Sequence, residues 1–152
     1  MFGRDKSKKN DESWKDRLVR WRRHIHQNPE LSFEEHETTD YIAGQLREMG
    51  LEAQRFELGT GLWVDVPAAA DATATDVVAL RADIDALPMD EESGEEFASR
   101  VEGVSHTCGH DGHTAMLLGA AELLTADPPP RPVRLIFQPA EETMTGGAKT
   151  CV

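Results

Sequence analysis

The sequence contains no apolar run long enough to cross a membrane, and it has only two cysteines among its 152 residues. A membrane helix needs roughly 18 to 20 consecutive apolar residues, and no segment approaches that length. The N-terminal residues are charged with no apolar stretch behind them, so no secretory signal is predicted. Two cysteines give little support to a disulfide framework. We therefore expect a cytoplasmic protein with no membrane partner.

Positive charge is also scarce. The chain has 16 lysines and arginines against 28 aspartates and glutamates, which gives a formal net charge of −12. A negative surface repels a phosphate backbone, so nucleic acid is not expected as a partner. Hydrophobic residues make up 39% of the chain and charged residues 29%, which is typical of a soluble globular protein. The length suits one domain with its own core.

Hydrophobic periodicity predicts three helices. The first runs from residue 14 to about residue 27, where Asn28-Pro29 ends it. The second is predicted to begin after Ser32, as an N-cap whose capping box Glu35 completes, and to run to about residue 49. The third covers residues 114 to about 125 and ends before a run of prolines.

Strands are predicted between and after these helices. The continuous apolar run at residues 77–80 is typical of a strand that is buried on both faces. Residues 68–76 and 89–107 are predicted to be loops. The alternation of strands and helices predicts an α/β fold. The predicted strands are residues 51–58 (the weakest), 62–66, 77–80 and 133–137.

The first candidate for chemistry follows the strand at residues 77–80. Asp83 and Asp85 are two residues apart, so they point to the same side if the strand continues. Strand ends are where α/β folds place their sites. A solvated strand end would explain the two aspartates about as well.

The second candidate is the segment 106–113, which holds three histidines, one cysteine and one aspartate. A thiolate and neutral imidazoles are preferred ligands of zinc and related metals, which points to Cys108 and His110. Not every member can be a ligand. His106 and His113 could instead support the ligands or contact a substrate. A polar loop with chance histidines is the alternative.

The third candidate is the pair Glu141-Glu142, directly after the strand at residues 133–137. One carboxylate could bind a metal while the other holds a proton, as metal-assisted hydrolysis requires. Adjacent carboxylates are usually only surface charge, so the pair gains weight from the segment 106–113. No function is predicted for Cys151. The other histidines are expected to be ordinary helix-surface or core residues: His24, His26 and His36.

Together these clusters resemble the amidohydrolase branch of the aminoacylase and carboxypeptidase metallopeptidase family, which includes hippurate hydrolase. The resemblance begins at about Trp14 and rests mainly on HTCGHDGH and QPAEE, with RRHIHQNPELSFEEHET and ALRADIDALPM in support. It implies a three-layer α/β catalytic domain with a mixed, mostly parallel sheet. That domain would occupy residues 13–152, after a disordered tail at residues 1–12.

The resemblance also implies an activity, the metal-dependent hydrolysis of the amide bond of small N-acyl amino acids such as hippurate. Cys108, His110 and Glu142 would be metal ligands. Glu141 would be the general base that acts on metal-activated water, and Asp85 would support the site. Asp83 stands where the wider family has a histidine ligand. The family's full site holds two divalent ions, of manganese, zinc, cobalt or nickel.

Family members continue with two further histidine ligands and a smaller dimerisation domain, which these residues do not include. We therefore expect an N-terminal part of the catalytic domain that holds at most one ion and is inactive alone, with a homodimer expected only for the longer protein. The alternatives are a dipeptidase or aminopeptidase of the same family and a non-catalytic metal-binding remnant. A structural zinc module is disfavoured, because such sites usually gather four protein ligands.

Overall fold

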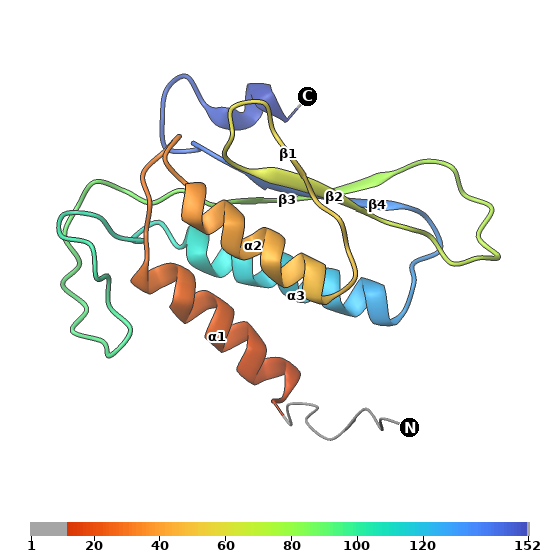
Figure 1. The fold of residues 1–152 in the computed structure, drawn as a ribbon, viewed down its shortest axis with the longest axis horizontal. Helices are drawn as coiled ribbons and strands as arrows, with labels where there is room; N and C mark the ends of the chain where they lie inside the picture. The colour runs from red at the N-terminus through yellow and green to blue at the C-terminus, as the bar shows by residue number, and fades with distance from the viewer. Residues whose placement is uncertain (1–11, 152) are drawn as a thin grey trace, which may run out of the picture.

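The computed structural model describes residues 12–151, and their strands form one sheet (Figure 1). The neighbouring strands β3 and β4 are parallel, whereas the other two pairs are antiparallel. The expected mixed α/β class is confirmed, but the described sheet is partly rather than mostly parallel. Residues 1–11 of the predicted tail lie outside the described residues. The strand order is β1 (Gln54–Arg55), β2 (Leu62–Val66), β4 (Val133–Gln138) and β3 (Val78–Asp83).

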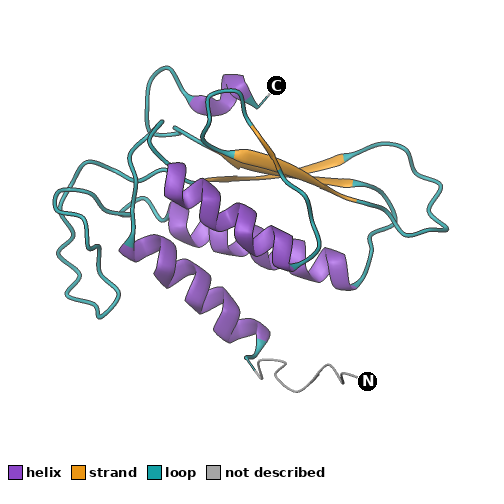
Figure 2. Cartoon of the chain, in the orientation of Figure 1, coloured by secondary structure: helices purple, strands orange, loops and turns teal. Residues whose placement is uncertain are grey.

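Three helices lie on one side of this sheet (Figure 2). They are α1 (Trp14–Gln27), α2 (His36–Glu48) and α3 (His110–Ala126). On the other side lies only the short 3-10 helix η1 (Gly147–Thr150), so the described part of the chain holds little of the expected third layer. No helix among residues 12–151 is both long and apolar enough for a membrane span.

The first helix confirms its prediction. The amide of Asp16 donates to the Ser13 hydroxyl at 3.2 Å, and the Asp16 carboxylate accepts from the Ser13 amide at 3.3 Å. This reciprocal capping satisfies two backbone donors that a helix start otherwise leaves unpaired. Trp21 is buried, and its indole donates to Gln45 at 2.6 Å. Trp21 therefore faces the core, whereas Trp14 at the start of the helix is exposed.

The predicted start of the second helix is wrong. α2 begins at His36, with Glu35 as its N-cap and no side-chain capping bond. The Ser32 hydroxyl donates instead to the Asp85 carboxylate at 2.6 Å. The Glu35 carboxylate accepts from the amide of Ala140 at 2.7 Å. Both side chains that the local pattern assigned to a capping box are bound to partners far away in the sequence.

The core lies between the sheet and the helices. Alternate residues of β2 and β4 point into it, and each fully buried aliphatic side chain contributes roughly 1.5–3 kcal/mol to folding. Ile42 and Leu46 of α2 and Leu118 of α3 are 0% exposed and meet this face. The buried strand residues are Leu62, Val64, Val66, Val133, Leu135 and Phe137.

Three further predictions need correction. The apolar run at residues 77–80 belongs to β3, an edge strand in which Val78 and Leu80 are 39% and 37% exposed, not buried on both faces. Apolar composition alone does not distinguish an edge strand from a central one. The weak strand at residues 51–58 shrinks to Gln54–Arg55. α3 begins at His110 rather than at residue 114, after Gly109 with a φ of 88° that favours glycine.

Candidate metal centre

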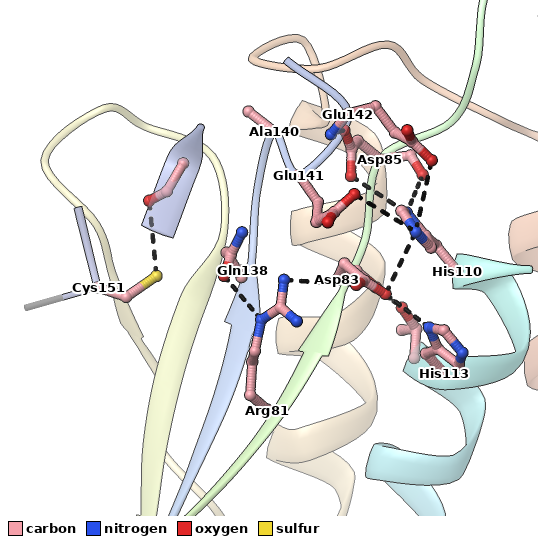
Figure 3. A network of polar contacts seen from close by, with 12 residues as sticks. Arg81, Asp83, Asp85, His110, His113, Gln138, Ala140, Glu141, Glu142 and Cys151 are labelled. Atoms are coloured by element: carbon pink, nitrogen blue, oxygen red, sulfur yellow. Dashed lines mark hydrogen bonds and ion pairs between the residues drawn. The ribbon is translucent and has the colours of Figure 1, made fainter. Parts of the chain in front are cut away.

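The three clusters singled out in the sequence meet beyond the carboxyl ends of β3 and β4 (Figure 3). β3 and β4 are parallel, so their carboxyl ends lie side by side. Asp83 ends β3 with Asp85 just beyond, and Glu141 and Glu142 follow β4. The first turn of α3 faces these carboxylates and carries His110. Open α/β sheets commonly bind their ligands outside the carboxyl ends of the strands.

His110 lies at the centre of this group and is 2% exposed. Its Nδ1 atom faces the backbone oxygen of Asp85 at 3.0 Å, while its Nε2 atom lies 3.6 Å from both Asp83 and Glu142. Glu141 is 4.0 Å from the same Nε2 atom. Burial by itself lowers the pKa of His110, but the hydrogen bond to Asp85 and the charges of Asp83 and Asp85 outweigh it and raise the pKa. Nε2 therefore faces a cluster of negative charge that suits a cation.

Asp85 holds two sides of the site together. It is 0% exposed, and its Oδ2 accepts from the Ser32 hydroxyl and from the Glu142 amide at 3.0 Å. Burial alone raises the pKa of Asp85, but hydrogen bonds from His110, Ser32 and backbone amides reverse this and lower it to about 2. Metal-binding histidines commonly donate their second ring N–H to such a group, which fixes the ring orientation.

Three potential ligand atoms converge in this centre. Atoms of Cys108, His110 and Glu142 lie within 4.8 Å of one another. The Oε1 atom of Glu142 is buried and has no hydrogen-bond partner, which is costly for a carboxylate. The adjacent Glu142 carboxylate, burial and nearby negative charges raise the pKa of the Cys108 thiol to about 11. A bound cation would reverse that shift and satisfy the orphaned oxygen, so these residues fit a divalent metal.

A second group of possible ligands shares the same histidine. Atoms of Asp83, His110 and His113 also lie within 4.8 Å of one another, and His113 Nδ1 lies 2.7 Å from Asp83 Oδ1. The sequence marked Asp83 and His113 as members of their clusters without assigning either as a ligand. Because both groups need His110, they form one polar centre rather than two separate sites.

The sequence did not predict the supporting roles of Glu35 and His26, and it gave His106 only as one of two residues that could support the ligands. Glu35 is fully buried and holds the turn at Ala140, whose φ of 50° is unusual for a residue with a side chain. His26, expected to be an ordinary histidine, is buried and bonded to two carboxylates. His106 is 3% exposed with neither ring nitrogen bonded, and burial lowers its pKa to about 4. No local pattern in the sequence predicts this burial or these long-range contacts.

The cysteines differ in their surroundings. Cys108 is exposed beside the cluster, whereas Cys151 lies next to η1 with its sulfur 3.7 Å from the backbone oxygen of Gly147. Both are free thiols, so a disulfide between them is not formed. Cys151 is therefore a natural control for experiments on Cys108.

Comparison with known proteins shows that the chain is similar to members of a peptidase family. Residues 79–152 match the model of peptidase family M20/M25/M40. A Rhodococcus jostii protein designated glutamate–cysteine ligase 2-3 is 56% identical over 132 residues, covering 87% of this chain and 16% of that protein. The N-acetyl-L-cysteine deacetylase of Bacillus subtilis is 48% identical over 134 residues, covering 87% of this chain and 32% of the deacetylase. The chain thus spans a third or less of these relatives.

A solved structure agrees with the fold. The crystal structure of the Bacillus subtilis YxeP protein, a dinuclear metal-binding peptidase from the M20 family, superposes with a TM-score of 0.84 and 43% sequence identity. The match covers 93% of this chain and 39% of that one. The similarity therefore extends over nearly all of the present chain and over a minor part of the neighbour.

Proposed function

We propose, from the match of residues 79–152 to the model of peptidase family M20/M25/M40, that the chain carries the metal-binding and proton-transfer part of an N-acyl amino acid amidohydrolase. The observation that carries the proposal is the convergence of Cys108, His110 and Glu142 within 4.8 Å, with one buried Glu142 oxygen unpaired. A thiolate, an imidazole and a carboxylate suit zinc, cobalt, manganese or nickel.

The two adjacent glutamates have different roles in this proposal. Glu142 directs its unpaired oxygen towards His110 at 3.6 Å, as a ligand would. Glu141 has a side chain that is 41% exposed, with its carboxylate 4.0 Å from the same imidazole. It therefore lies beside the proposed ligands while remaining open to solvent and substrate, which suits a general base.

The proposed reaction has two steps, attack of water on the carbonyl carbon and release of the amine. A divalent ion, when bound, supplies Lewis-acid activation of water and of the amide carbonyl. Glu141 takes a proton from the water molecule as the water oxygen attacks the carbonyl carbon. Glu141 then gives that proton to the amide nitrogen, the C–N bond breaks, and the carboxylic acid and the amino acid separate. Asp85 keeps His110 oriented throughout.

The proposed substrates are small N-acyl amino acids, hippurate-like compounds included. The similarity to the N-acetyl-L-cysteine deacetylase supports this class. A peptidase that acts on free peptides is the second candidate, because the YxeP neighbour is a peptidase. The ligase designation of the Rhodococcus protein does not enter the proposal, since the match covers 16% of that protein. A homodimer is proposed only for a longer protein that contains this chain.

Cobalt binding tests the site directly. Cobalt(II) is titrated into the chain while the thiolate-to-cobalt absorption band is followed. We expect Cys108→Ser to abolish the band and Cys151→Ser to leave it unchanged. A band that persists in Cys108→Ser, or that disappears in Cys151→Ser, would remove Cys108 from the centre.

Substrate class is tested separately. Because this chain is expected to be inactive alone, the assay uses a longer protein that contains it. Amine release from an N-acetyl amino acid, an N-benzoyl amino acid and an unblocked dipeptide is compared in the presence of cobalt, manganese or zinc. Hydrolysis of the blocked amino acids alone supports the amidohydrolase. Hydrolysis of the dipeptide alone would favour the peptidase instead.

A further inference from the structure

A buried polar network connects the first turn of α3 to α1. Asp111 directly follows His110 and is 0% exposed. Its Oδ2 atom accepts from His26 Nδ1 at 2.8 Å and from Arg22 Nε at 3.0 Å. Arg22 and His26 lie one turn apart on α1, so both donors come from the same helix face. The proposed reaction uses none of these three residues.

The same network reaches the loop that leads to the metal cluster. His26 Nε2 lies 3.0 Å from Glu91 Oε1, and Glu91 Oε2 accepts from the Ser99 amide at 2.6 Å. Although burial alone raises the pKa of Glu91, hydrogen bonds from Ser93, His26 and Ser99 lower it to about 2, so its carboxylate is ionised. Both nitrogens of His26 thus contact carboxylate oxygens.

The positions of these contacts bracket the proposed ligands. Successive helix residues point about 100° apart, so Asp111 faces α1 while His110 faces Asp85. Glu91 and Ser99 lie in the loop before Cys108, and Asp111 lies just after His110. His26 therefore joins the two segments that enclose Cys108 and His110.

Some buried polar atoms in and beside this network have no hydrogen-bond partner. The second carboxylate oxygen of Asp111 is buried and unpaired, and so are both ring nitrogens of the neighbouring His106. The rings of His26 and His106 are 6.4 Å apart between centroids. Loss of the Asp111 charge in Asp111→Asn would leave a single amide oxygen to accept from His26 Nδ1 and Arg22 Nε, which weakens both contacts.

We propose that Asp111 and His26 are positioning residues that hold Cys108 and His110 in ligand geometry before a metal binds. The inference rests on the proposed function, because it presumes that Cys108 and His110 bind the ion. Removal of groups that orient metal ligands typically weakens metal binding by about 10- to 100-fold. Asp111 and His26 should act in this way without contacting the ion.

The test compares cobalt affinity and the cobalt absorption spectrum of the chain with those of Asp111→Asn and His26→Gln. Measurements are made at a temperature at which circular dichroism shows each metal-free variant to be folded. We expect cobalt to bind about 10- to 100-fold more weakly, with a changed spectrum at saturation because the ligands relax. Should Asp111→Asn fail to fold, His26→Gln decides.

Glu122→Gln is the matched control. Arg17 and Glu122 form another ion pair between α1 and α3, distant in sequence from the ligands. Its loss should lower stability and leave cobalt binding unchanged. Wild-type affinity and spectrum in both test variants would overturn the positioning role, as would an equal loss in Glu122→Gln. Failure of the wild-type chain to bind cobalt would instead refute the proposed function, and the inference with it.

Discussion

The carboxylate of Glu35 accepts a hydrogen bond from the amide of Ala140 at 2.7 Å, across 105 residues of sequence. Glu35 is fully buried at the start of α2, and Ala140 begins the turn that carries Glu141 and Glu142. The contact therefore fixes the turn that presents both candidate carboxylates. Its neighbour Glu34 is exposed, which offers a comparison at the adjacent position.

Glu35→Ala should lower the free energy of unfolding by about 1–3 kcal/mol, because it leaves the buried Ala140 amide without an acceptor. It should also weaken cobalt binding, since the turn loses its support. Urea denaturation and cobalt titration measure the two effects. Glu34→Ala should change neither, and equal stabilities for the two variants would contradict the structural role of Glu35.

Glu141→Gln and Glu142→Gln should separate the roles of the adjacent carboxylates. Glu142→Gln removes a proposed ligand charge and should weaken cobalt binding at least 10-fold. Glu141→Gln should leave cobalt binding nearly unchanged while reducing any amide hydrolysis by about 10²- to 10⁴-fold. Titration and amine release are the two measurements. The opposite pattern would exchange the assignments.

His106 predicts a pH dependence of stability in the metal-free chain. Its buried imidazole has a pKa of about 4, against an ordinary value of 6.5. Between these values the unfolded chain binds a proton that the folded chain does not, so stability falls as the pH falls. The loss from pH 7.5 to pH 5 should be about 2 kcal/mol.

His106→Gln cannot titrate and should show a correspondingly smaller loss between the same two pH values. Urea denaturation in the presence of a chelator measures all four free energies. Identical losses in the wild type and the variant would show that His106 is not the group responsible.

Gly61→Ala should destabilise the chain for two reasons. Gly61 has a φ of 69°, and a Cβ there would meet Pro139 and approach the Phe137 oxygen at 2.8 Å. Gly103 has a similar φ of 73° with nothing within 4 Å, so Gly103→Ala isolates the backbone strain. We expect Gly61→Ala to cost about 1–3 kcal/mol more than Gly103→Ala, as overpacking does. Equal thermal shifts would argue against the close approach.

Local patterns were sufficient for much of the fold. The period of Trp14, Trp21 and Ile25 and the break at Asn28-Pro29 correctly predicted α1, because helix faces and proline act over a few residues. The strands β2 and β4 were predicted within one residue for the same reason. The prediction from local pattern was wrong at Ser32. Its hydroxyl donates to the buried carboxylate of Asp85, far along the chain, instead of capping the second helix.

What the sequence determined by itself was the chemical inventory, namely a cysteine, histidines and carboxylates placed after strands and before a helix. Spacing and residue type are local properties, and they pointed to a metal hydrolase with Cys108, His110, Glu141 and Glu142 as its candidate residues. Only the tertiary structure decided which groups face His110 and which strand lies at the sheet edge. It also decided that His26 of α1 contacts Asp111 of α3. These outcomes depend on contacts between distant segments, whose energies no local window of sequence contains.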